Sequence, residues 1–497
     1  MSTSYQNFIA GTWRDATAGA TFASVNPADT TDTVGHFPES GPADVDAAVE
    51  AARTTLPDWR ATPAPARGDI LRRIGDRLTE RKADLADAMT REMGKPVSET
   101  KGDVQEAIDT AYYAASETRR LFGHTVPSEL PSKMNLTIRR PVGVCGLITA
   151  WNFPVAVPTW KIFPALAAGN TVVYKPSEES PHCGVLLTEI LAEAGVPDGV
   201  VNLVLGADTA GRALVEHPDV DAIGFTGSSA VGKAIGETCG RLNTKYSAEM
   251  GGKNPMIVME DADLDLALEG VLWGAFGTTG QRCTATSRLI CHEAVVDELV
   301  GRIVDAAGDL TLGDGRADGT DVGPLINQEA LDTVSRYVHI GQTEDGATLR
   351  CGGQRATGNG LDDGFFFEPT VFTDVSREAR IFQEEIFGPV LVVHTVASYE
   401  EAVAAANDTV YGLSSCIYTQ DVTRSFRAMH DLEAGITYVN GPTIGAEAHM
   451  PFGGIKDTGN GHRDGGWAVF DFYTEVKTCY IDFSGQLQKA QMDNVDD

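Results

Sequence analysis

Hydrophobic residues follow two different spacings in the first half of the chain. Residues 42–121 repeat apolar side chains at the 3.6-residue period of amphipathic helices. From Gly143 onward, short apolar runs such as VGVCGLIT, NTVVYKP and AIGFTG alternate with helical stretches. Strands that alternate with helices are typical of a parallel sheet with crossover helices. The pattern therefore predicts an α/β domain against which the early helices pack.

A second alternating region runs from about Asn254 to Gly454 and contains the strand candidates PMIVME, SRLICHE, PVLVVHTV and GLSSCIYT. It predicts a second α/β domain, while the first region is interpreted as a Rossmann-like nucleotide domain. Two further alternating segments, MNLTIRRP and VKTCYIDF, lie outside both regions and are expected to pair as an excursion from the body. The polar ending QLQKAQMDNVDD is expected to fray.

Composition narrows the class of protein. A chain of 497 residues with 42% hydrophobic residues has room for more than one core, at roughly 150 residues per domain. The start MSTSYQNFIAGTW lacks the basic and apolar run of a signal peptide, and no stretch reaches the roughly 18 apolar residues of a membrane span. The 8 cysteines include no CxxC pair, so neither a zinc site nor a disulfide scaffold is expected. We expect a cytoplasmic protein with free thiols and no metal.

The charge balance excludes two kinds of partner. The chain carries 39 Lys and Arg against 70 Asp and Glu, a formal net charge of -31. Nucleic acids and anionic membranes would repel such a surface. Dense carboxylates that hold water while salt screens their repulsion are typical of a saline cytoplasm. We therefore expect a halophilic protein.

Cys283 differs from the other cysteines in its local sequence. It lies in Gly-Gln-Arg-Cys-Thr at positions 280–284, which is small and polar rather than apolar. A nearby glycine lets backbone approach a substrate, and a helix predicted to follow Cys283 would supply N–H groups that favour the thiolate. We expect packing roles for the remaining cysteines, which are Cys145, Cys183, Cys239, Cys291, Cys351, Cys416 and Cys479.

Polar residues also gather where strands are predicted to end. The segments WNFP at 151–154 and KPSE at 175–178 follow neighbouring strands, and EMGGKNP at 249–255 begins with an acid at a strand end. Carboxyl ends of parallel strands form the ligand crevice of open sheets. The glycine loop FTGSSAVGK at 225–233 precedes a helix and suits phosphate, but Ala234 replaces the hydroxyl that a P-loop needs to hold magnesium. A nucleotide hydrolase is therefore disfavoured.

Together these segments resemble one family. WNFP, KPSE, FTGSSAVG, EMGGKNP, GQRC and EEIFGPV, in this order, resemble the aldehyde dehydrogenase superfamily over nearly the whole chain. The resemblance implies an α/β fold with a Rossmann-type cofactor domain, a second α/β catalytic domain and a small β oligomerisation arm. The implied domains are cofactor binding over 1–127, 142–253 and 455–473, catalysis over 254–454, and arm and tail over 128–141 and 474–497.

The resemblance also implies catalytic roles. Cys283 would attack the aldehyde, because hydride leaves only after a tetrahedral adduct has formed. The side-chain amide of Asn152 and the backbone N–H of Cys283 would stabilise the oxyanion of that adduct. Glu249 would activate the water that hydrolyses the thioester, with a pKa raised by burial beside the nicotinamide.

The implied cofactor is NAD or NADP. Glu178 would accept hydrogen bonds from the ribose 2′-OH and repel a 2′-phosphate, which favours NAD, whereas Lys175 opposes that preference. The resemblance assigns the cofactor contacts to Trp151, Lys175, Ser177, Glu178, Gly227, Ser228, Gly232, Glu385 and Phe387.

Substrate and assembly follow from resemblance as well. The segments RRPVGVCGLITAWNFP and HMPFGGIKDTGNGHRD are most similar to 2,5-dioxopentanoate (2-oxoglutarate semialdehyde) dehydrogenases of sugar-acid breakdown. Succinate semialdehyde and simple aliphatic aldehydes are the alternatives, and Arg282 is the cation nearest to Cys283 in sequence. The resemblance implies a homodimer or homotetramer with arm strands exchanged between subunits.

Two departures from the family pattern stand out, and two other classes of protein compete. Met250 replaces the leucine that usually follows the glutamate. Asp464 falls in a region where many relatives carry glutamate, which leaves open whether this chain has an accessory proton path. A coenzyme A-acylating enzyme would not need Glu249. A noncatalytic relative would need neither Glu249 nor Cys283.

Overall fold

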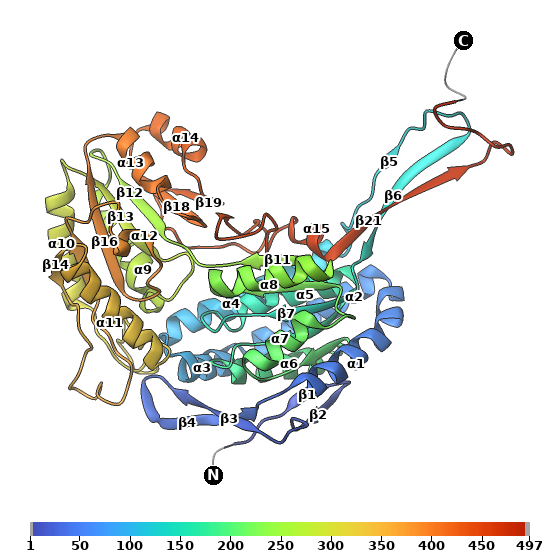
Figure 1. Cartoon of the computed structure of the whole chain (residues 1–497), viewed down its shortest axis with the longest axis horizontal. Helices are drawn as coiled ribbons and strands as arrows, with labels where there is room; N and C mark the ends of the chain where they lie inside the picture. Colours follow the sequence, from blue (N-terminus) through green and yellow to red (C-terminus); the bar gives the residue numbers. More distant parts are fainter. Residues whose placement is uncertain (1–2, 493–497) are drawn as a thin grey trace.

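The computed structural model describes residues 3–492 and contains two seven-stranded sheets, one from each alternating region (Figure 1). The first sheet has the order β11-β10-β7-β8-β9-β1-β2, and β11 through β9 are parallel to one another. Its strands are β1 (Asn7–Ile9), β2 (Thr12–Arg14), β7 (Val144–Ile148), β8 (Thr171–Lys175), β9 (Val201–Leu203), β10 (Ala222–Thr226) and β11 (Lys245–Glu249). The predicted parallel sheet is confirmed. Its antiparallel edge, β1 and β2, was not predicted because each of these strands has only 3 residues.

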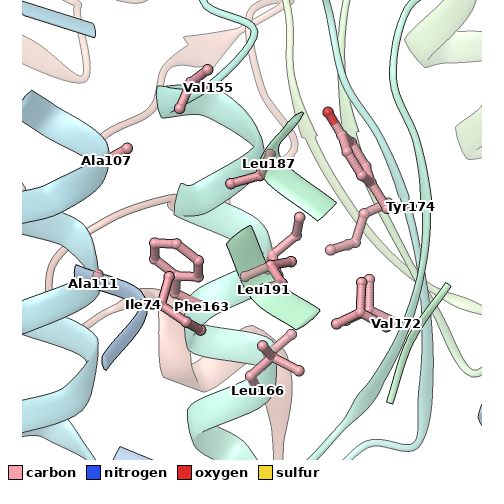
Figure 2. Packing of buried hydrophobic residues seen from close by; sticks show 14 of the residues in the cluster. Ile74, Ala107, Ala111, Val155, Phe163, Leu166, Val172, Tyr174, Leu187 and Leu191 are labelled. Atoms are coloured by element: carbon pink, nitrogen blue, oxygen red, sulfur yellow. The ribbon is translucent and has the colours of Figure 1, made fainter. Parts of the chain in front are cut away.

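Helices cover both faces of the first sheet, because side chains alternate along its buried strands. Val172 and Tyr174 of β8 pack into one large cluster with α2 to α6, part of which is shown in Figure 2, whereas Val173 packs into a second cluster with α1, α7 and α8. The predicted packing of the early helices is confirmed. These helices are α1 (Pro42–Ala61), α2 (Ala64–Glu80), α3 (Lys82–Met93), α4 (Val97–Glu117), α5 (Ala156–Ala168), α6 (Pro181–Glu193), α7 (Asp208–Glu216) and α8 (Ser229–Leu242).

The second sheet has the order β14-β15-β16-β13-β12-β18-β19 and is parallel except for the edge strand β14. Ile257 of β12 faces a cluster with α11 to α14, and its neighbours Met256 and Val258 face α9 and α10. Its strands are β12 (Asn254–Val258), β13 (Thr286–His292), β14 (Thr348–Cys351), β15 (Thr370–Thr373), β16 (Val390–Val396), β18 (Ser414–Tyr418) and β19 (Ile436–Val439). Its helices are α9 (Leu264–Phe276), α10 (Val296–Asp309), α11 (Gln328–Thr343), α12 (Arg380–Gln383), α13 (Tyr399–Asn407) and α14 (Val422–Asp431).

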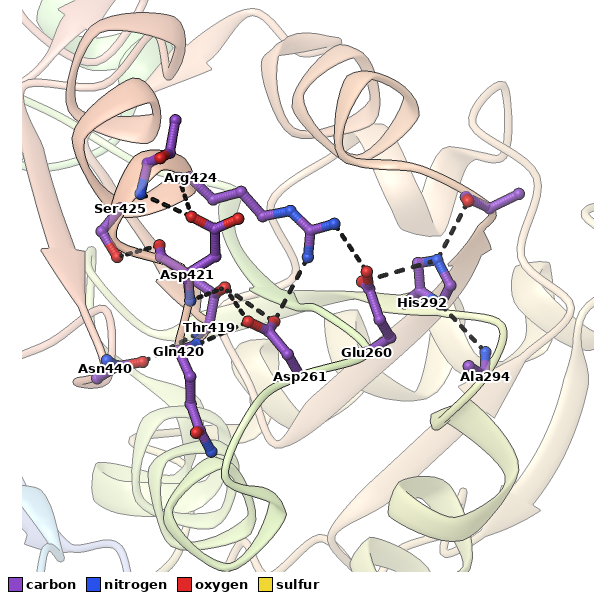
Figure 3. A network of polar contacts seen from close by, with 12 residues as sticks. Glu260, Asp261, His292, Ala294, Thr419, Gln420, Asp421, Arg424, Ser425 and Asn440 are labelled. Carbon is purple, nitrogen blue, oxygen red and sulfur yellow. Dashed lines mark hydrogen bonds and ion pairs between the residues drawn. The ribbon is translucent and has the colours of Figure 1, made fainter.

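A polar network ties the carboxyl end of β12 to the start of α14 (Figure 3). Arg424 of α14 contacts Glu260 at 2.7 Å and Asp261 at 3.5 Å, while the Asp421 carboxylate accepts hydrogen bonds from the first N–H groups of the helix. These contacts connect segments far apart in sequence and hold the sheet edge opposite β14 in place.

A long arm projects from the body (Figure 1). It consists of β5 (Thr125–Val126), β6 (Lys133–Pro141) and β21 (Thr474–Asp482), and β6 pairs antiparallel with β21 along its whole length. The predicted pairing of the two alternating segments is confirmed, and it occurs within one chain. Residues 493–497 of the predicted tail lie outside the described residues.

Shorter elements complete the fold. They are β3 (Thr21–Asn26), β4 (Asp29–Pro38), β17 (Tyr411–Gly412), β20 (Ile455–Lys456), the 3-10 turn η1 (Gly277–Gly280) and α15 (Val469–Tyr473). Within residues 3–492, no helix combines the length and apolar character needed to cross a bilayer.

Candidate active site

Residues from both sheets line a cavity of about 510 Å³. Most of the predicted site residues lie on its wall, namely Trp151, Asn152, Gly227, Ser228, Glu249, Arg282, Cys283, Glu385 and Phe387. Lys175, Ser177, Glu178 and Gly232 are not part of this wall. The cavity therefore brings the three predicted catalytic residues together with one end of the predicted cofactor site.

Asn152 and Glu249 reach the cavity because they follow parallel strands of one sheet. Glu249 is the last residue of β11, and Asn152 lies just beyond the end of β7, with β10 between them. Asn152 is 5% exposed, and its side-chain amide donates a hydrogen bond of 3.1 Å to the carbonyl of Gln281. This contact places the amide beside the segment that carries Cys283.

Cys283 occupies a turn between η1 and β13, so the helix predicted to follow it is wrong. The residues after it continue into a buried strand instead. Although the adjacent residues in sequence are small and polar, the Cys283 side chain packs against an apolar cluster that includes Val157, Trp160 and Phe452. Those residues come from distant segments, which adjacent sequence does not reveal.

The environment of Cys283 favours the thiol rather than the thiolate. Burial raises its pKa to about 12, and the carboxyl groups of Glu385 and Glu249 add to the rise. The N–H groups of Thr284 and Cys283 act in the opposite direction but do not prevail. The expected stabilisation of the thiolate is therefore wrong for this cavity, and a Cys283 that acts as predicted would need a base to accept its proton.

Glu249 has the properties of such a base. It is 3% exposed, and one carboxyl oxygen accepts a hydrogen bond of 3.2 Å from the N–H of Gly454. The other oxygen, Oε1, is buried without a hydrogen-bond partner among the described residues. Burial raises the pKa of Glu249 well above its usual range, and the like charge of Asp464 raises it further. The predicted direction of the shift is confirmed, without any contribution from a nicotinamide.

Asp464 lies next to Glu249 in the cavity wall and pairs with a buried lysine. The ammonium of Lys161 contacts its carboxylate at 2.6 Å, with side-chain exposures of 0% and 3%. Lys161 lies on α5, 303 positions away in sequence, and was not predicted as part of the site. The pair acts on Glu249 with opposite signs, because Asp464 raises its pKa and Lys161 lowers it.

An Asp464→Asn variant should lower the pKa of Glu249, because it removes a like charge and leaves the positive charge of Lys161 unopposed. The rate of thioester hydrolysis, which rises as Glu249 loses its proton, should then reach its plateau about one pH unit lower. Hydrolysis of p-nitrophenyl acetate measured from pH 5 to 9 checks this. Lys161→Met combined with Asp464→Asn is the matched control, since it removes both opposing charges and should shift the profile less. An unchanged profile in the single variant would refute this coupling.

Arg282 does not present an unpaired charge to the cavity. Its guanidinium contacts the Glu99 carboxylate at 2.6 Å, and the two side chains are only 9% and 5% exposed. The guanidinium also lies 4.5 Å from the ring of Trp273 and 5.5 Å from that of Phe153. Glu99 therefore competes with a substrate for Arg282, and the substrate-binding role of Arg282 stays a prediction.

Three of the predicted cofactor contacts, Ser228, Glu385 and Phe387, have local structures that suit a bound ligand. Ser228 caps the first turn of α8, where N–H groups attract phosphate. The Glu385 carboxylate accepts a hydrogen bond of 2.9 Å from the N–H of Gly252, and burial raises its pKa to about 7. Phe387 adopts a φ of 57° and meets the ring of Trp151 edge-on at 5.7 Å. A strained aromatic residue at a cavity wall is typical of a ligand clamp.

The remaining part of the predicted cofactor site lies at the end of β8. Lys175 is 5% exposed, and its ammonium contacts the Glu178 carboxylate at 3.5 Å. The contact holds the Lys175 ammonium beside the carboxylate that is predicted to meet a ribose 2′-OH. These residues suit an adenine dinucleotide, whose nicotinamide would accept hydride when bound.

Sequence reasoning missed much of the substrate side of the cavity. Its wall includes Glu99, Asp103 and Glu106 from α4 and Phe153, Val157 and Trp160 at the start of α5. The spacing of Glu99, Asp103 and Glu106 places them on one helix face, which is a detectable signal. Nothing in the sequence shows that this face meets a cavity.

The comparisons with known proteins agree with this geometry. The aldehyde dehydrogenase family model matches residues 13–479. The alpha-ketoglutarate semialdehyde dehydrogenase of Haloferax volcanii is 42% identical, covering 97% of this chain and 99% of the relative. The alpha-ketoglutaric semialdehyde dehydrogenase of Bacillus subtilis is 40% identical, covering 96% and 98%. The crystal structure of Staphylococcus aureus betaine aldehyde dehydrogenase with NAD+ has a TM-score of 0.95 at 33% identity, covering 98% and 96%.

The chain belongs to the aldehyde dehydrogenase family. Its two-sheet α/β architecture is the fold of that family. The chain is thus an enzyme for the oxidation of aldehydes with NAD or NADP.

Proposed function

We propose that the enzyme oxidises 2,5-dioxopentanoate to 2-oxoglutarate, with NAD as the preferred cofactor. The observation that carries the proposed chemistry is the shared cavity of Cys283 and Glu249, in which Glu249 presents a buried carboxyl oxygen without a hydrogen-bond partner. Similarity to two alpha-ketoglutarate semialdehyde dehydrogenases supports the choice of substrate. The Glu178 carboxylate supports the choice of NAD, because it would repel a 2′-phosphate.

The residues perform the reaction in two stages. Cys283 loses its proton and its sulfur bonds to the aldehyde carbon, which turns the carbonyl oxygen into an oxyanion. The amide of Asn152 and the N–H of Cys283 donate hydrogen bonds to that oxygen, and one such donor typically lowers the barrier by about 3 kcal/mol. The oxyanion re-forms the C=O bond as hydride leaves the adduct carbon, a bound nicotinamide would accept that hydride, and a thioester remains on Cys283.

Glu249 completes the cycle. Its carboxylate removes a proton from water, the resulting hydroxide attacks the thioester carbon, and the C–S bond breaks to release the carboxylic acid and the Cys283 thiol. A raised pKa suits a general base, because it makes the Glu249 carboxylate a stronger acceptor for a proton of water. The presence of Glu249 argues against a coenzyme A-acylating enzyme, because such an enzyme would not need a base for hydrolysis.

The arm supports a proposal about assembly. Its strand β21 exposes Val476, Tyr480 and Ile481 at 61%, 67% and 49%. Exposed apolar side chains on an edge strand favour contact with another chain. We propose a homodimer or homotetramer in which the arm contacts a second subunit.

A panel of aldehydes tests the substrate and the cofactor together. kcat/KM is measured from absorbance at 340 nm for 2,5-dioxopentanoate, succinate semialdehyde and propanal, each with NAD and with NADP. We expect 2,5-dioxopentanoate with NAD to exceed every other combination by about tenfold or more, which corresponds to about 1.4 kcal/mol. A higher value for another aldehyde would overturn the substrate while leaving aldehyde oxidation in place. The E. coli succinate-semialdehyde dehydrogenase GabD, 39% identical, makes that aldehyde the strongest competitor.

A further inference from the structure

Two cations contact acids of the cavity wall: Arg282 lines the cavity itself, and Lys95 lies buried behind it. Lys95 contacts Asp103 at 2.7 Å with both side chains 0% exposed, and Arg282 contacts Glu99 at 2.6 Å. Lys95 also donates a hydrogen bond of 3.1 Å to the carbonyl of Asn152, which ties this pair to the catalytic loop. Because both cations are compensated, neither is available to neutralise an anionic substrate.

Glu106 is a third acid on the same helix, without a matching cation. It lines both the catalytic cavity and an adjoining hollow of about 560 Å³, so it lies where the two meet. Its Oε1 is buried and has no hydrogen-bond partner among the described residues. Burial raises its pKa to about 8, and the Asp103 carboxylate contributes, while Lys95 and Arg282 act in the opposite direction. Near neutral pH this carboxyl group therefore keeps its proton.

Other charged and titratable groups also face Glu106. They are Asp109 on the same helix, Lys95 before it, Arg282 beside Cys283, Tyr438 on β19, and Glu447 and His449 at the rim of the hollow. The acids in this set oppose ionisation of Glu106. A second carboxylate placed here would add to that effect.

We propose that the protonated Glu106 donates a hydrogen bond to the distal carboxylate of an anionic aldehyde and thereby determines substrate specificity. The inference rests on the proposed function and adds the group that recognises the far end of the substrate. A neutral carboxyl group offers an O–H donor, Glu106 Oε1 has no partner among the described residues, and a substrate carboxylate is a strong acceptor for such a donor. Once ionised, Glu106 loses the donor and repels the same carboxylate.

The opposite chemistry would use Glu106 in its ionised form to bind an ammonium group. That mode would favour cationic aldehydes and would strengthen as the pH rises. The two modes therefore predict opposite pH dependence, which makes them separable by kinetics.

The test compares aldehydes of different charge on the same enzyme. kcat/KM is measured from pH 6.5 to 9.5 for 2,5-dioxopentanoate, succinate semialdehyde, 4-aminobutanal and pentanal, and each value is divided by that for uncharged pentanal. The division removes the titration of Cys283 and Glu249, which all four substrates share. With a pKa of about 8, the protonated fraction of Glu106 falls from about nine-tenths at pH 7 to about one-tenth at pH 9. The ratio for 2,5-dioxopentanoate should fall about tenfold over that range.

Two variants locate the effect. Glu106→Gln keeps a neutral donor that cannot ionise, so the ratio for 2,5-dioxopentanoate should stay high and become independent of pH. Glu293→Gln removes an exposed acid that lines neither the cavity nor the hollow and should leave the fall unchanged. A ratio that does not vary with pH in the wild type, or a fall that persists in Glu106→Gln, would overturn the inference. A preference for 4-aminobutanal that grows with pH would also overturn it.

Failure of the proposed substrate can be distinguished from failure of the proposed role of Glu106. If 2,5-dioxopentanoate is a poor substrate at every pH while succinate semialdehyde shows the tenfold fall, the role of Glu106 is supported and the proposed substrate is wrong. If 2,5-dioxopentanoate is preferred at every pH by the same factor, the substrate stands and the role of Glu106 is wrong.

Discussion

A Cys283→Ser variant is expected to lose aldehyde oxidation by more than about 10⁴-fold in kcat/KM. The serine hydroxyl has nearly the same size but is a far weaker nucleophile, and the cavity gives little help because burial already raises the pKa of the Cys283 thiol to about 12. The measurement is NADH or NADPH formation at 340 nm over a range of aldehyde concentrations that spans KM. A thermal unfolding curve like that of the wild type shows that the loss is chemical.

The matched control is Cys351→Ser. Cys351 is also partly exposed, but it lies on β14 and is not part of the catalytic cavity. This variant should keep wild-type turnover. If Cys283→Ser retained a tenth or more of the activity, the assignment of Cys283 as nucleophile would be wrong.

A Glu249→Gln variant is expected to carry out one turnover and then stop, with steady-state kcat lowered by about 10³-fold. Glutamine can still accept the hydrogen bond from Gly454, and replacing a buried acid by an amide of the same shape should preserve the fold. The variant lacks a base for water, so the thioester on Cys283 accumulates.

A rapid-mixing experiment separates the two stages. We expect a burst of reduced cofactor of about one equivalent per active site, followed by almost no further formation, and a mass increase of the protein equal to the acyl group. The rate of the burst reports whether Glu249 also accepts the thiol proton, since a buried thiol with a raised pKa needs a nearby base. Glu293→Gln, an exposed acid that follows β13, is the control and should turn over normally. Wild-type steady-state turnover in Glu249→Gln would refute its role in hydrolysis.

The raised pKa values of Cys283 and Glu249 share a cause and reinforce each other. Each group is buried in the same cavity, and the Glu249 carboxylate is one of the charges that raise the pKa of the thiol. Protonation of either group therefore removes part of the electrostatic penalty from the other. In this cavity both groups hold their protons more tightly than they would in water.

The order of hydrophobic runs by itself determined the two α/β regions, the helices packed on the first sheet, and the pairing of β6 with β21. These features follow from local spacing, because buried strands and amphipathic helices need particular repeats of apolar residues. Glu249 at the end of β11 and Lys175 at the end of β8 were predictable for a similar reason, since glycine or proline within two residues after a strand favours its end. Strands of 3 residues such as β1 carry too little pattern to be predicted.

Only the tertiary structure decided the electrostatic state of the site. The helix expected after Cys283 is a strand, and its apolar wall comes from α5 and Phe452, so burial raises the pKa that local sequence suggested was lowered. The partner of Asp464 is Lys161, which comes from another part of the chain. Glu106 has no paired cation because the nearby cations, Lys95 and Arg282, already contact other acids. A pKa depends on burial and on charges within a few ångströms in space, and neither quantity is encoded in sequence separation.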